Sequence, residues 1–271
     1  MKVRYNIFLL LILIITRTGA AQDSGSVDTS AATESLQSFP LNEPRPAADV
    51  SILKLFPRVL NDQKQIFLFP ISAARGRHLK PLIAVVGITA AFIAIEEHNA
   101  QSFKGMESLE GFNSIFTGKS TSIGMAAVPL TLYATGLLKK DKYAQSTFWL
   151  AGEAVIDTAI LTTVMKDINR RLRPRDIPEN AGQSNTWFKY RTRNYLTGVG
   201  SFPSGHTIAA FSIATTYAKR YPKPRWRVWL AYGLASVVGF SRVSQQSHFP
   251  SDVFAGAALG YAITNFVVLN K

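Results

Sequence analysis

The stretch FPSGHTIAAF (residues 202–211) places a helix-start signal, a glycine and a histidine directly ahead of an apolar segment. Ser204 suits the N-cap of a helix, and a helix start presents backbone N–H groups that bind anions such as phosphate. Gly205 lets a ligand oxygen approach the backbone, because it has no Cβ. His206 then lies in the first turn, beside any bound anion. A plain capped helix with a solvent-facing histidine is the alternative for this stretch alone.

Long apolar segments rich in Ala, Leu and Gly occupy most of the chain from about residue 80 onward. They lack period-two alternation and exceed ordinary strand length, so they predict six helices: 82–95, 122–138, 146–165, 207–218, 228–240 and 253–270. The predicted fold is therefore all-α, a six-helix bundle domain over residues 76–271 with the active site at one end.

A second polar stretch, KDINRRLRP (residues 166–174), lies where the third predicted helix runs into a basic, proline-stopped loop. Lys166 and Arg173 are its candidate anion ligands. Taken alone, this stretch favours a simpler interpretation, in which the cations complement the C-terminal end of the helix dipole.

A third stretch, SRVSQQSHFPSD (residues 241–252), connects the last two predicted helices. It contains Arg242, His248 and Asp252. An aspartate four residues after a histidine can hold the imidazole in one tautomer, as in nucleophile activation. The alternatives are a metal site or a solvated ion pair, although four histidines in the chain supply a multi-histidine metal centre poorly.

Together the three stretches suit a phosphoryl group. Several cations and backbone N–H groups can neutralise its oxygens, while one histidine attacks and the other protonates the leaving oxygen. The chain has no cysteine, which excludes disulfides, thiolate metal sites and a cysteine nucleophile.

The motifs Lys-x6-Arg-Pro, Pro-Ser-Gly-His and Ser-Arg-x5-His-x3-Asp, in this order, resemble the signatures of the type-2 phosphatidic-acid phosphatase and vanadium haloperoxidase superfamily. The resemblance covers roughly residues 82–270. It implies that His248 is the nucleophile forming a phosphohistidine, Asp252 orients it, and His206 is the general acid. It also implies no metal or other cofactor, vanadate binding as a phosphate mimic, and these phosphate ligands: Lys166, Arg173, Ser204, Gly205 and Arg242.

Residues 1–21 have two early cations, an apolar run and small residues, which predicts a cleaved export signal; an uncleaved membrane anchor is the alternative. Residues 22–75 are predicted to be a flexible arm. Within it, residues 51–71 predict a short amphipathic helix broken by Pro57 and Pro70.

The net charge of +13 favours an anionic partner. We expect an exported protein, periplasmic or membrane-associated, with its active site on the outer side of the inner membrane. Most apolar segments are shorter than the roughly 20 residues a span needs, but residues 253–270 are free of charge and nearly long enough, so integral insertion stays open. Glu153 and Asp157 would also be costly in lipid; we interpret them as helix-face residues, not an acid/base pair.

The loop at 175–202 interleaves aromatic residues, among them Trp187 and Phe188, with cations, which suits a membrane headgroup region. We therefore expect a phosphatase acting on a lipid phosphate such as phosphatidic acid or undecaprenyl diphosphate, gated by this loop. The alternatives are a soluble periplasmic broad-specificity acid phosphatase acting on small phosphate esters, a vanadate-dependent haloperoxidase, and a non-catalytic module binding anionic membranes. A nucleic-acid partner is not expected. The run TGKS (residues 117–120) lacks the glycine and preceding strand of a nucleotide-binding loop.

Overall fold

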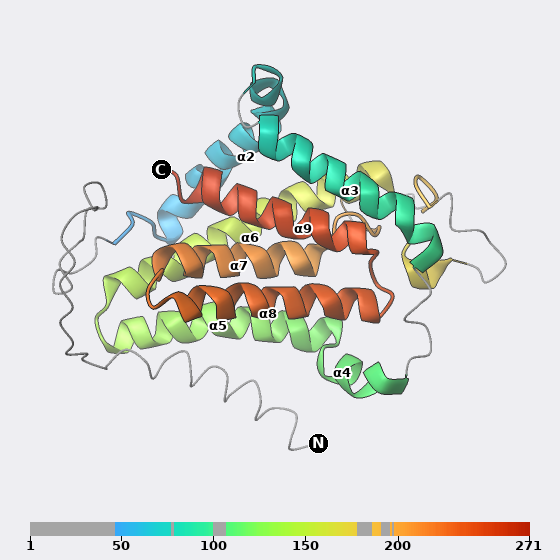
Figure 1. The fold of residues 1–271 in the computed structure, drawn as a ribbon. Helices are drawn as coiled ribbons and strands as arrows, with labels where there is room; N and C mark the ends of the chain where they lie inside the picture. Colours follow the sequence, from blue (N-terminus) through green and yellow to red (C-terminus); the bar gives the residue numbers. More distant parts are fainter. Residues whose placement is uncertain (1–46, 77–78, 100–106, 178–185, 191–195, 197) are drawn as a thin grey trace, which may run out of the picture.

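The computed structural model describes residues 47–76, 79–99, 107–177, 186–190, 196 and 198–271, and this part of the chain is all-α, without strands (Figure 1). Its helices are α2 (Ile52–Ala74), α3 (Leu79–Asn99), α4 (Glu110–Ile115), α5 (Gly118–Leu138), α6 (Lys142–Asn169), α7 (Gly205–Arg220), α8 (Arg225–Ser244) and α9 (Pro250–Ile263). A π-helical turn, η3 (Thr264–Val268), extends α9, and short 3₁₀ turns are η1 (Glu107–Leu109) and η2 (Pro174–Asp176). The predicted signal peptide (residues 1–21) and residues 22–46 of the predicted arm lie outside the described residues.

Helix α7 lies inside the bundle and packs on α5, α6, α8 and α9 (Figure 1). Small residues allow this packing. A Cβ atom at Gly260 of α9 would lie only 2.5 Å from the carbonyl oxygen of Ile208, and one at Gly256 only 2.9 Å from that of Ser204. Two glycines four residues apart let helix backbones approach closely. The first turns of α7 and α9 are thereby brought together.

Each predicted apolar segment lies within an observed helix or its π-helical extension, except for the last two residues, Leu269 and Asn270. The N-terminal helix differs from the prediction, because α2 is one helix that contains both Pro57 and Pro70. Proline removes a backbone hydrogen bond and clashes with the preceding turn. Tertiary packing of α2 on α6 and η3 offsets this cost, and the sequence pattern does not reveal that packing.

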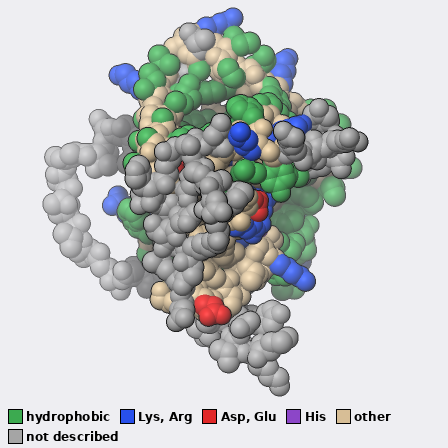
Figure 2. All heavy atoms as spheres, turned by 90° about the vertical axis from the view of Figure 1, so that its right-hand side faces the viewer, with side chains coloured by type: hydrophobic (Ala, Val, Ile, Leu, Met, Phe, Trp, Pro, Cys, Tyr) green, Lys and Arg blue, Asp and Glu red, His purple; other side chains and the backbone are tan. Residues whose placement is uncertain are grey.

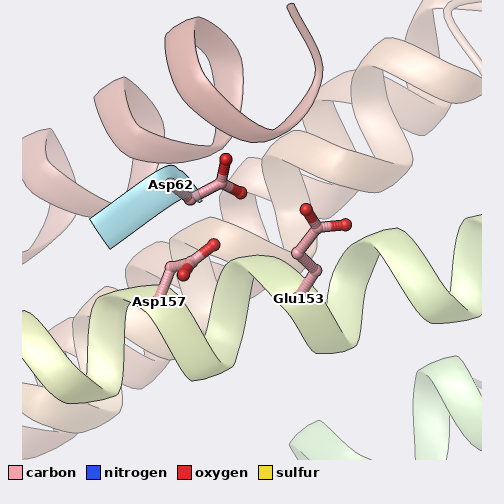
Figure 3. Close-up of side chains that lie close together, drawn as sticks. All are labelled: Asp62, Glu153 and Asp157. Carbon is pink, nitrogen blue, oxygen red and sulfur yellow. The ribbon is translucent and has the colours of Figure 1, made fainter. Parts of the chain in front are cut away.

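Buried charged side chains join α2 to α6. Asp62 of α2 and Glu153 and Asp157 of α6 point toward one another and are fully buried (Figure 3). Arg58 donates to both oxygens of Glu153 at 3.1 and 2.9 Å, and Lys271 Nζ bridges Asp62 at 2.7 Å and Glu153 at 2.6 Å. The two α6 carboxylates therefore lie inside the protein, which removes our objection that they would face lipid.

Four described segments are long and apolar enough to cross a membrane: Leu79–Glu96, Gly118–Leu138, Lys142–Asp176 and Pro250–Val268. Our expectation that most segments are too short is wrong, because the helices continue past the apolar runs into small and polar residues. Large hydrophobic side chains of α2, α3 and α5 are exposed, and Figure 2 shows such side chains over the upper part of one face, with Lys and Arg among them and at its edge.

Candidate active site

The polar stretches identified in the sequence meet at one end of the bundle. Asn169, the last residue of α6, donates from its side chain to the carbonyl oxygen of Phe202 at 2.7 Å. The backbone N–H of Ser204 donates to the carbonyl oxygen of Asp252 at 3.0 Å. Hydrogen bonds to the main chain therefore hold the end of α6, the start of α7 and the start of α9 together.

His248 lies buried in the loop before α9, with Nδ1 3.5 Å from Oδ2 of Asp252. Asp252 is in the first turn of α9, where Oδ2 accepts from the N–H of Phe249 at 2.9 Å and from the hydroxyl of Ser201. Helix geometry thus fixes the carboxylate beside the imidazole. Because Nδ1 faces Asp252, Nε2 is the ring nitrogen left to react.

His206 lies in the first turn of α7, as the sequence predicts. Its Nε2 is 3.2 Å from the carbonyl oxygen of Gly118 and 3.2 Å from the hydroxyl of Ser122. Both partners belong to the start of α5, where the sequence predicted a helix from residue 122 but no site residue. The start of α5 is therefore a fourth wall of the site.

Three predicted phosphate ligands surround the two histidines. Burial is the main cause of the lowered pKa of both His206 and His248; the positive charges of Lys166 and Arg173 lower both pKa values further, and Arg242 also lowers that of His206. Charges act on these pKa values only at short range. The structure therefore brings five of the predicted site residues together at one end of the bundle.

Arg242 is held rigidly at the last turn of α8. Its Nη2 donates to the carbonyl oxygen of Phe116 and, at 3.1 Å, to the hydroxyl of Thr121. A Cβ placed on Gly118 would lie 3.6 Å from Arg242 Nη1 and 3.8 Å from His206 Nε2. The bare backbone of Gly118 thus leaves room between a cation and a histidine.

The start of α7 has the open backbone expected of an anion site. Ser204 occupies the N-cap without a side-chain cap bond, and its hydroxyl instead accepts from Thr207 at 2.9 Å. A Cβ placed on Gly205 would lie 3.9 Å from Lys166 Nζ. The helix start therefore faces the lysine without an intervening side chain.

The pKa values of the two histidines, which lie outside the four spanning segments, are both lowered. Burial lowers the pKa of His248 to about 4 and outweighs the Asp252 carboxylate, which raises it. Burial and Arg242 lower the pKa of His206. At neutral pH, His248 is therefore uncharged, whereas His206 holds a proton most readily in acid or beside an anion.

A buried arginine that the sequence analysis did not single out lies behind Asp252. Arg171 Nη1 donates to Asp252 Oδ1 at 2.6 Å, and Nη2 donates to Oε2 of Glu96, at the end of α3. The sequence offered weak signals for both: Arg171 is one of four arginines in a short run, and Glu96 is an acid closing an apolar segment.

The loop predicted to gate a lipid is described at residues 175–177, 186–190, 196 and 198–202. Trp187 packs inward, with its ring 4.5 Å from the guanidinium carbon of Arg171 and tilted against Phe202. Phe188 is 73% exposed. Of these two aromatic residues, Phe188 is therefore the better placed to touch a membrane or a lipid.

One group of carboxylates among the described residues could offer oxygen ligands to a cation: Asp62, Glu153 and Asp157. Arg58 and Lys271 already pair with two of these carboxylates. No residue of this group belongs to the predicted site.

An apolar cavity of about 360 Å³ lies between α5, α7 and α8 and shares residues with the site. Met125, Ala214 and Leu234 are typical of its lining. Phe116 and Thr121 also line it, and these two residues hold Arg242. One end of the cavity therefore lies beside the residues that hold Arg242.

The helical bundle thus holds a buried histidine–aspartate pair, a second histidine and several cations at one end. Residues 147–270, a little under half of the chain, match the PAP2 superfamily, and over these residues the resemblance seen in the motifs is confirmed.

Named relatives match parts of the chain. Identity is 40% over 74 residues with a lipid A 1-phosphatase of Porphyromonas gingivalis, covering 27% of this chain and 17% of that protein. It is 46% over 67 residues with the bacitracin transport permease protein BcrC of Bacillus licheniformis (25% and 32%). It is 24% over 163 residues with a lipid A 4'-phosphatase of P. gingivalis (59% and 64%). The chain thus spans less than two thirds of the length of each.

Among solved structures, the chain resembles a transmembrane PAP2-type phosphatidylglycerolphosphate phosphatase from Bacillus subtilis. The match has 20% sequence identity and a TM-score of 0.39, and it covers 80% of this chain and 94% of that one.

Proposed function

We propose that this chain is a lipid phosphate phosphatase that works without a metal through a phosphohistidine at His248. The observation that supports this best is the meeting of the buried His248–Asp252 pair with a second histidine and three cations at one end of the bundle. The PAP2 match and the lipid A phosphatases among the relatives agree with it.

The reaction has two steps. Nε2 of His248 attacks phosphorus, the P–O bond to the lipid breaks, and His206 donates its proton to the leaving oxygen. Water then attacks the phosphohistidine, His206 takes a proton from that water, and the P–N bond breaks to return neutral His248 and free phosphate. Asp252 stabilises the positive charge on the imidazole between the steps.

The substrate in this proposal carries a long apolar chain, as phosphatidic acid and undecaprenyl diphosphate do. The cavity between α5, α7 and α8 supports this, because a chain attached to a phosphate near Arg242 can extend along it. Four span-length segments support a membrane location, where such substrates reside.

The proposal also includes export directed by residues 1–21, a six-helix core, and an active site on the outer side of the membrane. Lys166, Arg173 and Arg242, with the backbone at Ser204 and Gly205, hold the phosphoryl oxygens. Vanadate, a phosphate mimic, should bind in their place and inhibit.

The test is phosphate release in EDTA by wild type and His248→Ala from a diacylglycerol phosphate, undecaprenyl diphosphate and p-nitrophenyl phosphate. We expect release from at least one lipid, loss of release in the variant, and inhibition by vanadate. Release from the small ester alone would favour the soluble acid phosphatase. No release from any substrate would contradict the proposal and reopen the haloperoxidase and membrane-binding alternatives.

A further inference from the structure

The guanidinium of Arg171 is a fixed element directly behind the reacting histidine. Its side chain is only 2% exposed, and it lies between the rings of Trp187 at 4.5 Å and Phe249 at 4.1 Å. Its Nε donates to the hydroxyl of Thr186 at 3.2 Å. A planar group held on both faces and along its edge has little freedom to rotate.

The two ends of this guanidinium bind two different carboxylates. Nη1 donates to Asp252 Oδ1 at 2.6 Å and to the hydroxyl of Ser251 at 2.7 Å, while Nη2 donates to Oε2 of Glu96. The other Glu96 oxygen accepts from the N–H of Ser251 at 2.8 Å. Glu96 of α3 therefore anchors Arg171 to the first turn of α9.

Arg171 also decides which oxygen of Asp252 faces the histidine. Oδ1 is occupied by the guanidinium, so the carboxylate presents Oδ2 to Nδ1 of His248 at 3.5 Å. The N–H of Phe249 and the hydroxyl of Ser201 bind the same Oδ2. The arginine and these donors together set the carboxylate plane.

The charges of Arg171 and Asp252 indicate what the second carboxylate, that of Glu96, contributes. Arg171 alone would cancel the charge of Asp252 and leave no net negative charge beside His248. With Glu96 the buried set carries one net negative charge, which balances the positive imidazole ring of a phosphohistidine. A buried charge is stable only when it is paired. The net negative charge of Glu96, Arg171 and Asp252 is therefore better balanced when His248 is phosphorylated and positive than when its ring is neutral.

We propose that Glu96 and Arg171 are positioning residues for the phosphoryl transfer: Arg171 orients Asp252 toward His248 Nδ1, and Glu96 restores the negative charge that stabilises the phosphorylated ring. The proposal rests on the proposed function. It assigns a role to α3, whose residues lie outside the family match at 147–270.

Two conservative variants test this role. Glu96→Gln keeps the shape and removes the charge, and Arg171→Lys keeps the charge but loses the fork that holds two carboxylates. We expect kcat on p-nitrophenyl phosphate or the lipid substrate to fall about 10²-fold, the loss that small misplacement of a reacting group causes. KM should change little, because Lys166, Arg173 and Arg242 are untouched.

A readout independent of turnover is the tautomer of His248 at pH 7 by ¹⁵N NMR of histidine-labelled protein, assigned with His248→Asn. Wild type should show the Nδ1–H tautomer, and both variants should lose part of it. The matched control is Arg58→Lys, which weakens the buried pair with Glu153 and should leave kcat and the tautomer unchanged.

The results for kcat and for the His248 tautomer distinguish a positioning role from a purely stabilising one. Wild-type kcat per folded molecule and a wild-type tautomer in both variants would reduce Glu96 and Arg171 to a stabilising pair, and equal losses in Arg58→Lys would also overturn the proposal. If Arg171→Lys does not fold, Glu96→Gln decides alone. If wild type releases no phosphate, the proposed function fails, and the tautomer still tests the positioning.

Discussion

At the scale of single residues, the two histidines of the site have the same charge preference but different tasks in the proposed reaction. Burial disfavours the charged form of both His206 and His248. An uncharged ring suits a nucleophile, whereas a general acid must hold a proton. The difference between the tasks therefore makes the reaction depend on pH.

We predict that kcat/KM for p-nitrophenyl phosphate has an acidic maximum. It should rise with pH through about 4, where His248 loses its proton, and fall again as His206 loses its proton below its ordinary pKa of about 6.5. A pH–rate profile of wild type and His206→Asn measures this. The variant should lose the falling limb, and a wild-type maximum above pH 7 would contradict the assignment.

The residues of the motifs were predictable because their chemistry depends on residue type and spacing. Lys166, Arg173, Arg242 and both histidines were all singled out from the sequence, and the structure brings them together. Arg171 and Glu96 were not, because a buried arginine and an exposed one look alike in a sequence. Only contacts with Asp252 distinguish Arg171 from its neighbours.

At the scale of helices, a larger side chain on α7 can fill the cavity between α5, α7 and α8. Ala214 of α7 lines it, whereas Ala126 of α5 is exposed and does not. We predict that Ala214→Phe lowers turnover of a long-chain lipid phosphate much more than that of p-nitrophenyl phosphate, because the ring occupies space that the chain would take.

Ala126→Phe is the matched control for the same change in side chain and should leave both rates near wild type. Rates on vesicle or detergent-dispersed lipid and on the small ester, measured on the same preparations, give the ratio. If Ala214→Phe leaves the ratio of the lipid rate to the small-ester rate unchanged, the cavity does not bind the chain of the substrate.

The close approach of α7 and α9 supplies a prediction about stability. Gly260→Ala places a Cβ 2.5 Å from the carbonyl oxygen of Ile208, so the helices must separate, at a cost of about 1–3 kcal/mol. Gly233→Ala on α8 meets nothing within 4 Å and should stabilise by up to about 1 kcal/mol through helix propensity.

Thermal unfolding in detergent should therefore give a lower midpoint for Gly260→Ala and an equal or higher one for Gly233→Ala. Equal midpoints for the two variants would show that α7 and α9 are less tightly packed than the glycine pair implies.

At the scale of the whole molecule, the site and the turn between α5 and α6 lie at opposite ends of the bundle. Gly118 and Lys166 are at the site, whereas Lys139 lies between the other ends of these helices. If the bundle crosses a membrane, Phe188 and Lys139 should be on opposite sides.

The absence of cysteine makes this measurable with single-cysteine variants. We predict that Phe188→Cys reacts with a membrane-impermeant maleimide in intact cells, and that Lys139→Cys reacts only after permeabilisation. Labelling of both in intact cells would contradict a spanning bundle, and the reverse pattern would place the site on the inner side.

The sequence by itself determined the helical class, the approximate positions of the helices and the motif residues, because period, length and spacing are local properties. Tertiary structure decided what depends on residues far apart: the packing of α2 despite two prolines, the burial of Glu153 and Asp157 against Asp62, the start of α5 as a wall of the site, and the Glu96–Arg171–Asp252 chain. In each case, groups that are tens of residues apart in the sequence pair with one another or exclude water together. A local sequence pattern cannot predict such contacts.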